Sequence, residues 1–116
     1  MIMIQDTGRA GGGPGALFAP GDLVRHRRYG YRGVVVDLDT RCEAPADWYD
    51  SNQTQPNREQ PWYHVLVDQS HAATYAAQDS LAPDDSAAEI THPLLGRFFR
   101  AFQDGRYLRN DRPWGT

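Results

Sequence analysis

The chain has 116 residues, of which 40% are hydrophobic and 23% are charged, and its formal net charge is -3. This length fits one globular domain that buries about 60 to 70% of its unfolded surface. Because the chain is slightly acidic, it is unlike a histone or ribosomal tail coated in positive charge, and any nucleic-acid contact must be local.

The first seventeen residues, 1–17, are predicted to form a flexible tail. Glycine dominates Gln5–Ala16, which leaves little to bury. A phosphate-binding P-loop is disfavoured, because Gly15 leads to Ala16 and Leu17 instead of a Lys-Ser/Thr pair. The apolar start Met1–Ile4 is too short for a signal peptide or a membrane span, so we expect a cytoplasmic protein without membrane contact.

The next two elements are predicted to be the strands of a β-hairpin, Leu23–His26 and Gly33–Asp39. Both are rich in apolar or β-branched residues and are bounded by turn signals. Gly30 can supply the positive φ that a tight connection needs. The turn between the strands concentrates four arginines, one histidine and two tyrosines within Arg25–Arg32, and we expect the hairpin to present these arginines to solvent.

This turn supplies the candidate binding residues. They are Arg25, Arg27, Arg28, Tyr29, Tyr31 and Arg32. Arginine pairs through two prongs with phosphate or carboxylate, and tyrosine offers a flat amphipathic face. The segment 33–96 carries eleven acidic residues against two arginines. Some arginines of the turn could therefore pair with these acids instead of a ligand, and the sequence leaves both interpretations open.

A long connection, 40–61, separates this hairpin from a second one. Trp48 and Tyr49 lie in its middle and are expected to fold back on the sheet, and its length suggests a role or mobility. Trp62–Asp68 and Ala73–Ala77 have the composition of strands and are separated by a short polar turn. They predict another antiparallel pair.

Helical spacing appears near the end of the chain and predicts a helix over Pro93–Gln103. The apolar residues at this spacing are Leu94, Leu95, Phe98, Phe99 and Phe102. Pro93 suits a first helical position and Gly105 suits a stop. We expect this helix to cover the open end of a small sheet. A secondary basic patch is predicted from Arg97, Arg100, Arg106 and Arg109.

These elements predict a mainly β fold, a small SH3-like β-barrel with a short C-terminal helix, over residues 18–105. An Arg-rich tail, 106–116, is expected to follow. Barrels of this kind serve more often as binding platforms than as enzymes.

Catalysis is not expected, nor is a metal or any other cofactor. The four histidines and Cys42 lack a close-spaced pair of the kind seen in zinc sites. A Cys42–His64 nucleophile pair would need a convergence in space that the sequence does not show. Asp37 with Asp39 could be an acid pair, but the end of a strand explains both. Cys42, the one cysteine, cannot form an internal disulfide.

The order and spacing of several segments resemble one known family. The segments are Pro20–Asp37, Pro61–Asp68, Thr74–Tyr75 and Ile90–Phe99. They are similar to the hemimethylated-DNA-binding (YccV-like) family, which includes the heat-shock protein HspQ. The resemblance implies an SH3-like barrel and attachment to DNA methylated on one strand. For the heat-shock members it also implies a stress-response role as a specificity factor for a Lon-type ATP-dependent protease.

Two partners therefore follow as hypotheses. In the first, four arginines of the turn contact phosphates. The logarithm of DNA affinity then falls with the logarithm of salt concentration at a slope of about -3 to -4. In the second, an acidic segment of an ATP-dependent protease or its client pairs with the same arginines. Self-association into a homo-oligomer is left open. The Gly-rich start and Arg106–Arg112 depart from the family pattern.

Overall fold

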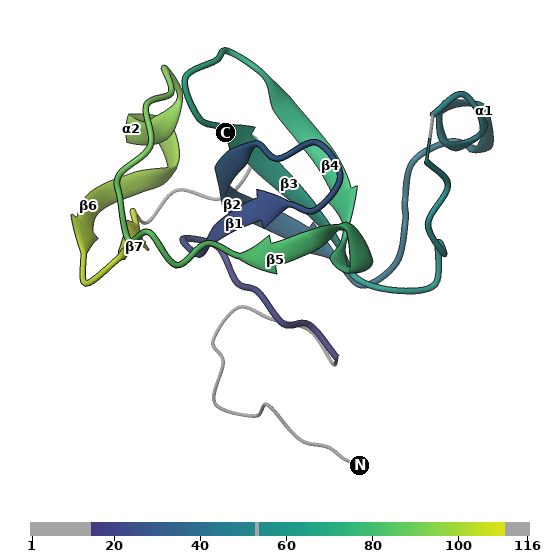
Figure 1. Cartoon of the computed structure of the whole chain (residues 1–116), viewed down its shortest axis with the longest axis horizontal. Coiled ribbons are helices and arrows are strands. Elements are labelled where there is room, and N and C mark those ends of the chain that lie inside the picture. The colour runs from purple at the N-terminus through teal and green to yellow at the C-terminus, as the bar shows by residue number, and fades with distance from the viewer. Residues whose placement is uncertain (1–14, 53, 111–116) are drawn as a thin grey trace.

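The computed structural model describes residues 15–52 and 54–110, and its main element is a five-stranded antiparallel sheet (Figure 1). The strands are β1 (Leu23–His26), β2 (Arg32–Asp39), β3 (Trp62–Val67), β4 (Ala73–Ala77) and β5 (Leu81–Pro83). They lie in the order β4-β3-β2-β1-β5. The β1–β2 and β3–β4 pairs confirm both hairpins predicted from the sequence.

The remaining elements are short. They are α1 (Ala46–Asp50), the 3-10 helix η1 (Gln78–Ser80), α2 (Leu95–Phe98), and a second sheet of β6 (Phe99–Gln103) and β7 (Arg106–Arg109). The fold is thus mainly β, as predicted. Hydrogen bonding gives an open order with β4 and β5 at the edges of the described sheet, so the closed SH3-like barrel stays a prediction. No helix of the described ranges is long and apolar enough to cross a bilayer.

The central strand β2 is buried on both of its faces. Val35 packs with Val24 and Tyr63 in one apolar cluster. Its neighbours Val34 and Val36 point to the other face, because successive side chains of a strand alternate, and they pack in a second cluster with residues such as Phe99. Burial on both faces explains an unbroken valine run in place of apolar–polar alternation.

The helix predicted over Pro93–Gln103 is wrong. Only Leu95–Phe98 is helical, and Phe99–Gln103 forms strand β6, which pairs with β7. The turn between them has positive φ at both Asp104 (55°) and Gly105 (79°), the geometry of a tight two-residue hairpin. Gly105 therefore serves a hairpin turn and not a helix stop, and β6–β7 rather than a helix covers one face of the sheet at Phe99 and Tyr107.

Order extends to both sides of the predicted barrel limits, 18–105. Most of the predicted tails, 1–14 and 111–116, lies outside the described residues. Ala16 is nevertheless buried, and the backbone N–H of Leu17 donates to Tyr63 Oη at 3.2 Å. At the other end, the Arg-rich tail begins as strand β7.

The strand β7 closes against the turn that precedes β1. Tyr107 N donates to Gly21 O at 2.9 Å, and a Cβ built on Gly21 would lie 2.1 Å from Tyr107 O. Gly21 also has φ of 100°, a conformation that other residues rarely adopt. Arg106 Nη2 donates to Asp22 Oδ1 at 2.9 Å beside this contact. A glycine is therefore required where the two ends of the domain meet.

Candidate functional site

We call the β1–β2 turn, residues 25–32, the tip; it is organised by the buried side chain of His26. The Nδ1 atom of His26 accepts hydrogen bonds from the backbone N–H groups of Arg28 (3.2 Å) and Tyr29 (3.1 Å). Its ring stacks on Tyr29 at 4.6 Å between centroids and lies 5.0 Å from Tyr31. Gly30 has the positive φ expected of it, 78°. The tip is thus a rigid turn.

Protonation of His26 would disturb this turn. Burial, followed by the positive charge of Arg28, lowers the pKa of His26 from its ordinary value of 6.5. The neutral ring keeps a lone pair on Nδ1, which the two backbone donors require. His26 therefore acts as a structural acceptor at neutral pH.

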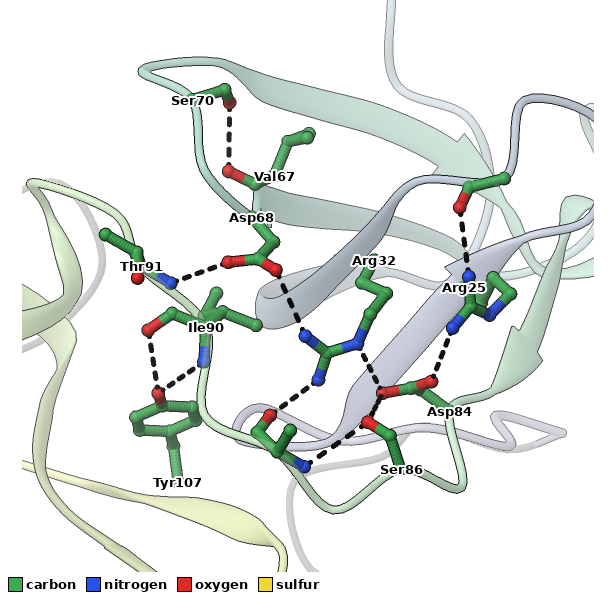
Figure 2. A network of polar contacts seen from close by, with 12 residues as sticks. Arg25, Arg32, Val67, Asp68, Ser70, Asp84, Ser86, Ile90, Thr91 and Tyr107 are labelled. Carbon is green, nitrogen blue, oxygen red and sulfur yellow. Dashed lines mark hydrogen bonds and ion pairs between the residues drawn. The ribbon is translucent and has the colours of Figure 1, made fainter.

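Two of the four tip arginines are engaged by carboxylates of the same chain (Figure 2). Asp84, whose side chain is 2% exposed, accepts from Arg25 Nη2 at 3.2 Å and from Arg32 Nε at 2.8 Å. Arg32 Nη1 also donates to Asp68 Oδ2 at 3.0 Å. The expectation that the hairpin presents all four arginines to solvent is therefore wrong for Arg32 and only partly met by Arg25, which stays 48% exposed.

The carboxylate of Asp84 is held ionised by this pairing. Burial alone would raise its pKa, but hydrogen bonds from Ser86 and Arg32 and the charges of Arg32 and Arg25 outweigh burial. The pKa of Asp84 therefore lies below its ordinary value. A charged Asp84 cancels much of the positive potential that the sequence places at the tip.

The other two tip arginines remain exposed. Arg28 lies over the ring of Tyr29, 5.8 Å from guanidinium carbon to ring centroid. Arg27 Nε donates to the carbonyl of Leu81 at 3.1 Å, which directs the side chain toward β5. Tyr29 keeps 52% of its surface exposed. Tyr31 is half-buried, because its hydroxyl bonds to Thr74 Oγ1 at 2.8 Å.

The predicted secondary basic patch divides into two parts. Arg100 Nε donates to the carbonyl of Arg109 at 3.2 Å, so these two residues lie together on the β6–β7 hairpin. The carbonyl of Arg97 accepts from Asn110 Nδ2 at 2.7 Å and joins that group. Arg106 lies at the other end of the hairpin, paired with Asp22. The backbones of Arg97, Arg100 and Arg109 thus lie near one another, Arg106 lies apart from them, and the secondary basic patch stays a prediction.

An aromatic cleft of about 630 Å³ opens beside the tip. Its walls come from the tip, from the 40–61 loop and from strands β3 and β4. The aromatic and histidine side chains that line it are His26, Tyr29, Tyr31, Trp48, Tyr49, Trp62, His64 and Tyr75. Trp48 lies 5.8 Å from Tyr75 and 6.3 Å from Trp62 between ring centroids. The loop aromatics thus fold back on the sheet, as predicted.

Comparison with known proteins identifies the family. Residues 16–106 match the family model described as "Hemimethylated DNA-binding protein YccV like". The chain belongs to this YccV-like family. It is also similar to F-box only protein 21 of Homo sapiens and of Mus musculus, with 32% identity over 96 residues in each case. The match covers 80% of this chain and 15% of each relative, so the chain spans a small part of their length.

The aromatic cleft of the YccV-like domain was missed by sequence reasoning. Its principal rings come from three separate segments, at Trp48, Trp62 and Tyr75. Arg58 fixes the loop that carries Trp48, since Arg58 Nη2 donates to Ala44 O at 2.6 Å and its guanidinium lies 4.9 Å from the Tyr49 ring. The long connection with aromatics in its middle was the one available signal.

Cys42 has a structural environment in the YccV-like domain. Its side chain is buried with Trp62 and Ala77 beneath the loop. His64, the partner considered for it, lies instead against Tyr75 at 4.6 Å between rings, with Nε2 3.6 Å from Asp39 Oδ2. Cys42 therefore serves as a small apolar residue in the packing of the loop.

Proposed function

We propose that this domain is a non-enzymatic module that binds DNA, preferentially hemimethylated duplex, through Arg27, Arg28 and Tyr29. The observation that carries the proposal is a tip held by hydrogen bonds to His26, in which two adjacent exposed arginines, Arg27 and Arg28, directly precede the exposed ring of Tyr29. Arginine neutralises phosphate, and an aromatic or apolar surface can sense a methyl group in the major groove. The description of the family gives independent support.

The internal pairing of Arg25 and Arg32 changes the expected strength of binding. With two phosphate contacts, the logarithm of affinity should fall with that of salt concentration at a slope of about -2. One methyl group is a weak discriminator, worth roughly 5- to 150-fold between hemimethylated and unmodified duplex. Affinity for DNA at this site should therefore be modest and fall only shallowly with salt, whereas the preference for the methyl group should not depend on salt.

Fluorescence anisotropy on short unmodified, hemimethylated and fully methylated duplexes tests the proposal. The Arg27→Ala/Arg28→Ala variant should lose most of the affinity, because both phosphate contacts disappear. The Arg100→Ala/Arg109→Ala variant removes the same charge from the β6–β7 hairpin and should retain it. If only the second variant lost affinity, the DNA site would lie on β6–β7 and the tip would be excluded.

A protein partner is the alternative, as in an adaptor for a Lon-type ATP-dependent protease or its clients. One observation favours it: Asp84 withdraws two arginines from the tip, in a chain whose net charge is already -3. A mixed surface of this kind suits a protein better than a polyanion. Capture of the protease that persists at high salt, with no dependence on duplex methylation, would select this function.

A further inference from the structure

The aromatic cleft exposes one large ring, that of Trp48, beside two more buried rings of the sheet. Trp48 of α1 is 37% exposed although it lies beside Trp62 and Tyr75. Trp62 and Tyr75 are 5.3 Å apart with an interplanar angle of 35°. The ring of Trp48 on the loop therefore packs at an angle against the rings of Trp62 and Tyr75 on the sheet. The face of an aromatic ring is negative and attracts cations.

The fixed charges of the cleft have the same sign as the ring faces. Asp39 and Glu43 both line it, and its lining in the described residues includes no arginine. The Asp39 carboxylate accepts from Tyr75 Oη at 2.6 Å, and Tyr75 Oη in turn accepts from Glu43 N at 3.0 Å. Within the described ranges neither carboxylate forms an ion pair with an arginine. This cleft repels phosphate and attracts a cation.

The wall opposite the loop is the edge of a sheet. β4 ends the strand order, and all five of its residues, Ala73–Ala77, line the cleft. Its inner edge pairs with β3, and its outer edge has no neighbouring strand in the described sheet; because Ala76 and Ala77 are buried, the accessible part of this edge is Ala73–Tyr75. An exposed edge can accept an extended peptide as an additional strand. The occupant is therefore a chain segment and not a small cation alone.

We propose that the cleft binds an extended basic segment of a protein partner, which pairs with the accessible part of the β4 edge and places one arginine side chain against the exposed ring of Trp48, near Asp39 and Glu43. This site goes beyond the DNA contact proposed at the tip and differs from it in the sign of its charge. Tyr29 borders both surfaces. The cleft combines two carboxylates, an exposed indole ring and an accessible stretch of strand edge.

The probes are three labelled seven-residue peptides of alternating threonine and valine that differ only at the central residue, which is arginine, glutamine or glutamate. The arginine peptide should bind roughly 5- to 30-fold more tightly than the glutamine peptide, because it adds cation–π and ion-pair contacts. The glutamate peptide should not bind. Backbone amide shifts in Ala73–Ala77 on titration would place the peptide at the β4 edge.

Matched variants locate the site. Trp48→Ala and Asp39→Asn should each weaken the arginine peptide about tenfold, whereas Asp50→Asn, which removes a charge from α1 outside the cleft lining, should not. Arg27→Ala/Arg28→Ala should leave peptide affinity unchanged, so failure of the DNA proposal would not be confused with failure of this one.

Three results would overturn the proposal. They are equal affinity for the three peptides, absence of arginine-peptide binding at roughly 1 mM, and binding of oligothymidine that Trp48→Ala abolishes. The last result would show that the cleft stacks nucleobases in place of a cationic side chain.

Discussion

The tip and the aromatic cleft differ most in what neutralises their charges. At the tip, Asp84 and Asp68 pair with Arg25 and Arg32, so two of the four positive charges that the sequence concentrates there are neutralised within the domain. In the cleft, Asp39 and Glu43 line the cavity among aromatic rings, and Asp39 contacts Tyr75 and His64 but forms no ion pair with an arginine of the described residues. The charge that a surface offers to a partner depends on pairing in space, and residue counts along the chain do not give it.

The largest expected effect comes from Asp84→Ala, which breaks the pairing at the tip. It should lower the free energy of unfolding by about 2 to 4 kcal/mol, less than for a fully buried pair, because Arg25 is half-exposed and Arg32 keeps Asp68. Urea denaturation measures this loss. The neighbouring, exposed Asp85→Ala is the control and should change stability by less than about 0.5 kcal/mol.

Asp84→Ala should also affect binding at the tip and not binding in the cleft. Freed Arg25 should steepen the salt slope of DNA binding from about -2 toward -3 while leaving peptide binding in the cleft unchanged. An unchanged slope in folded Asp84→Ala protein would mean that Arg25 does not reach the DNA.

Gly33→Ala tests the close packing of β2 against β3, the strand pair that supports both the tip and the cleft. A Cβ at Gly33 would lie 2.4 Å from Leu66 O, across the β2–β3 pair. The clash should cost about 1 to 3 kcal/mol in thermal or urea unfolding. Gly96→Ala meets nothing within 4 Å and serves as the control. Equal stability of the two variants would show that the β2–β3 register differs from the one described.

A smaller effect is expected where the tip is tied to the cleft wall. Tyr31→Phe removes the hydroxyl that bonds to Thr74 Oγ1 on β4 and should cost about 0.5 to 1.5 kcal/mol. A double-mutant cycle with Thr74→Val measures the coupling free energy. Additive losses would mean that tip and cleft move independently.

The smallest effect is a pH dependence from one group, His26. Its pKa is lowered in the folded domain, so unfolding takes up a proton as pH falls below 6.5 and stability falls with it. His26→Asn keeps an acceptor for the turn but does not titrate. The difference in unfolding free energy between pH 7.5 and 5.5 should therefore be larger in the wild type than in this variant. An equal difference in the two proteins would show that His26 does not cause the pH dependence.

The hairpins could be predicted because their signals are local. β1–β2 and β3–β4 each combine apolar runs with a short polar turn, and both form as expected. The helix over Pro93–Gln103 was mispredicted, because the phenylalanine spacing also suits a hairpin when Asp104–Gly105 makes the turn.

The candidate site depended on contacts that are remote in sequence. Asp84 lies 59 residues from Arg25 and 52 from Arg32, and no pattern along the chain joins them. The same holds for the cleft, whose rings at Trp48, Trp62 and Tyr75 come from the loop, β3 and β4. Composition located the arginines and the aromatics, and tertiary pairing decided which of them are available.

The hydrogen bond from Tyr107 N to Gly21 O joins the last strand of the domain to the turn before its first strand. A substitution at Gly21 should therefore displace β7 as well as the turn, because the new Cβ would meet the Tyr107 carbonyl. One glycine thus couples two segments that are 86 residues apart, counted from Gly21 to Tyr107.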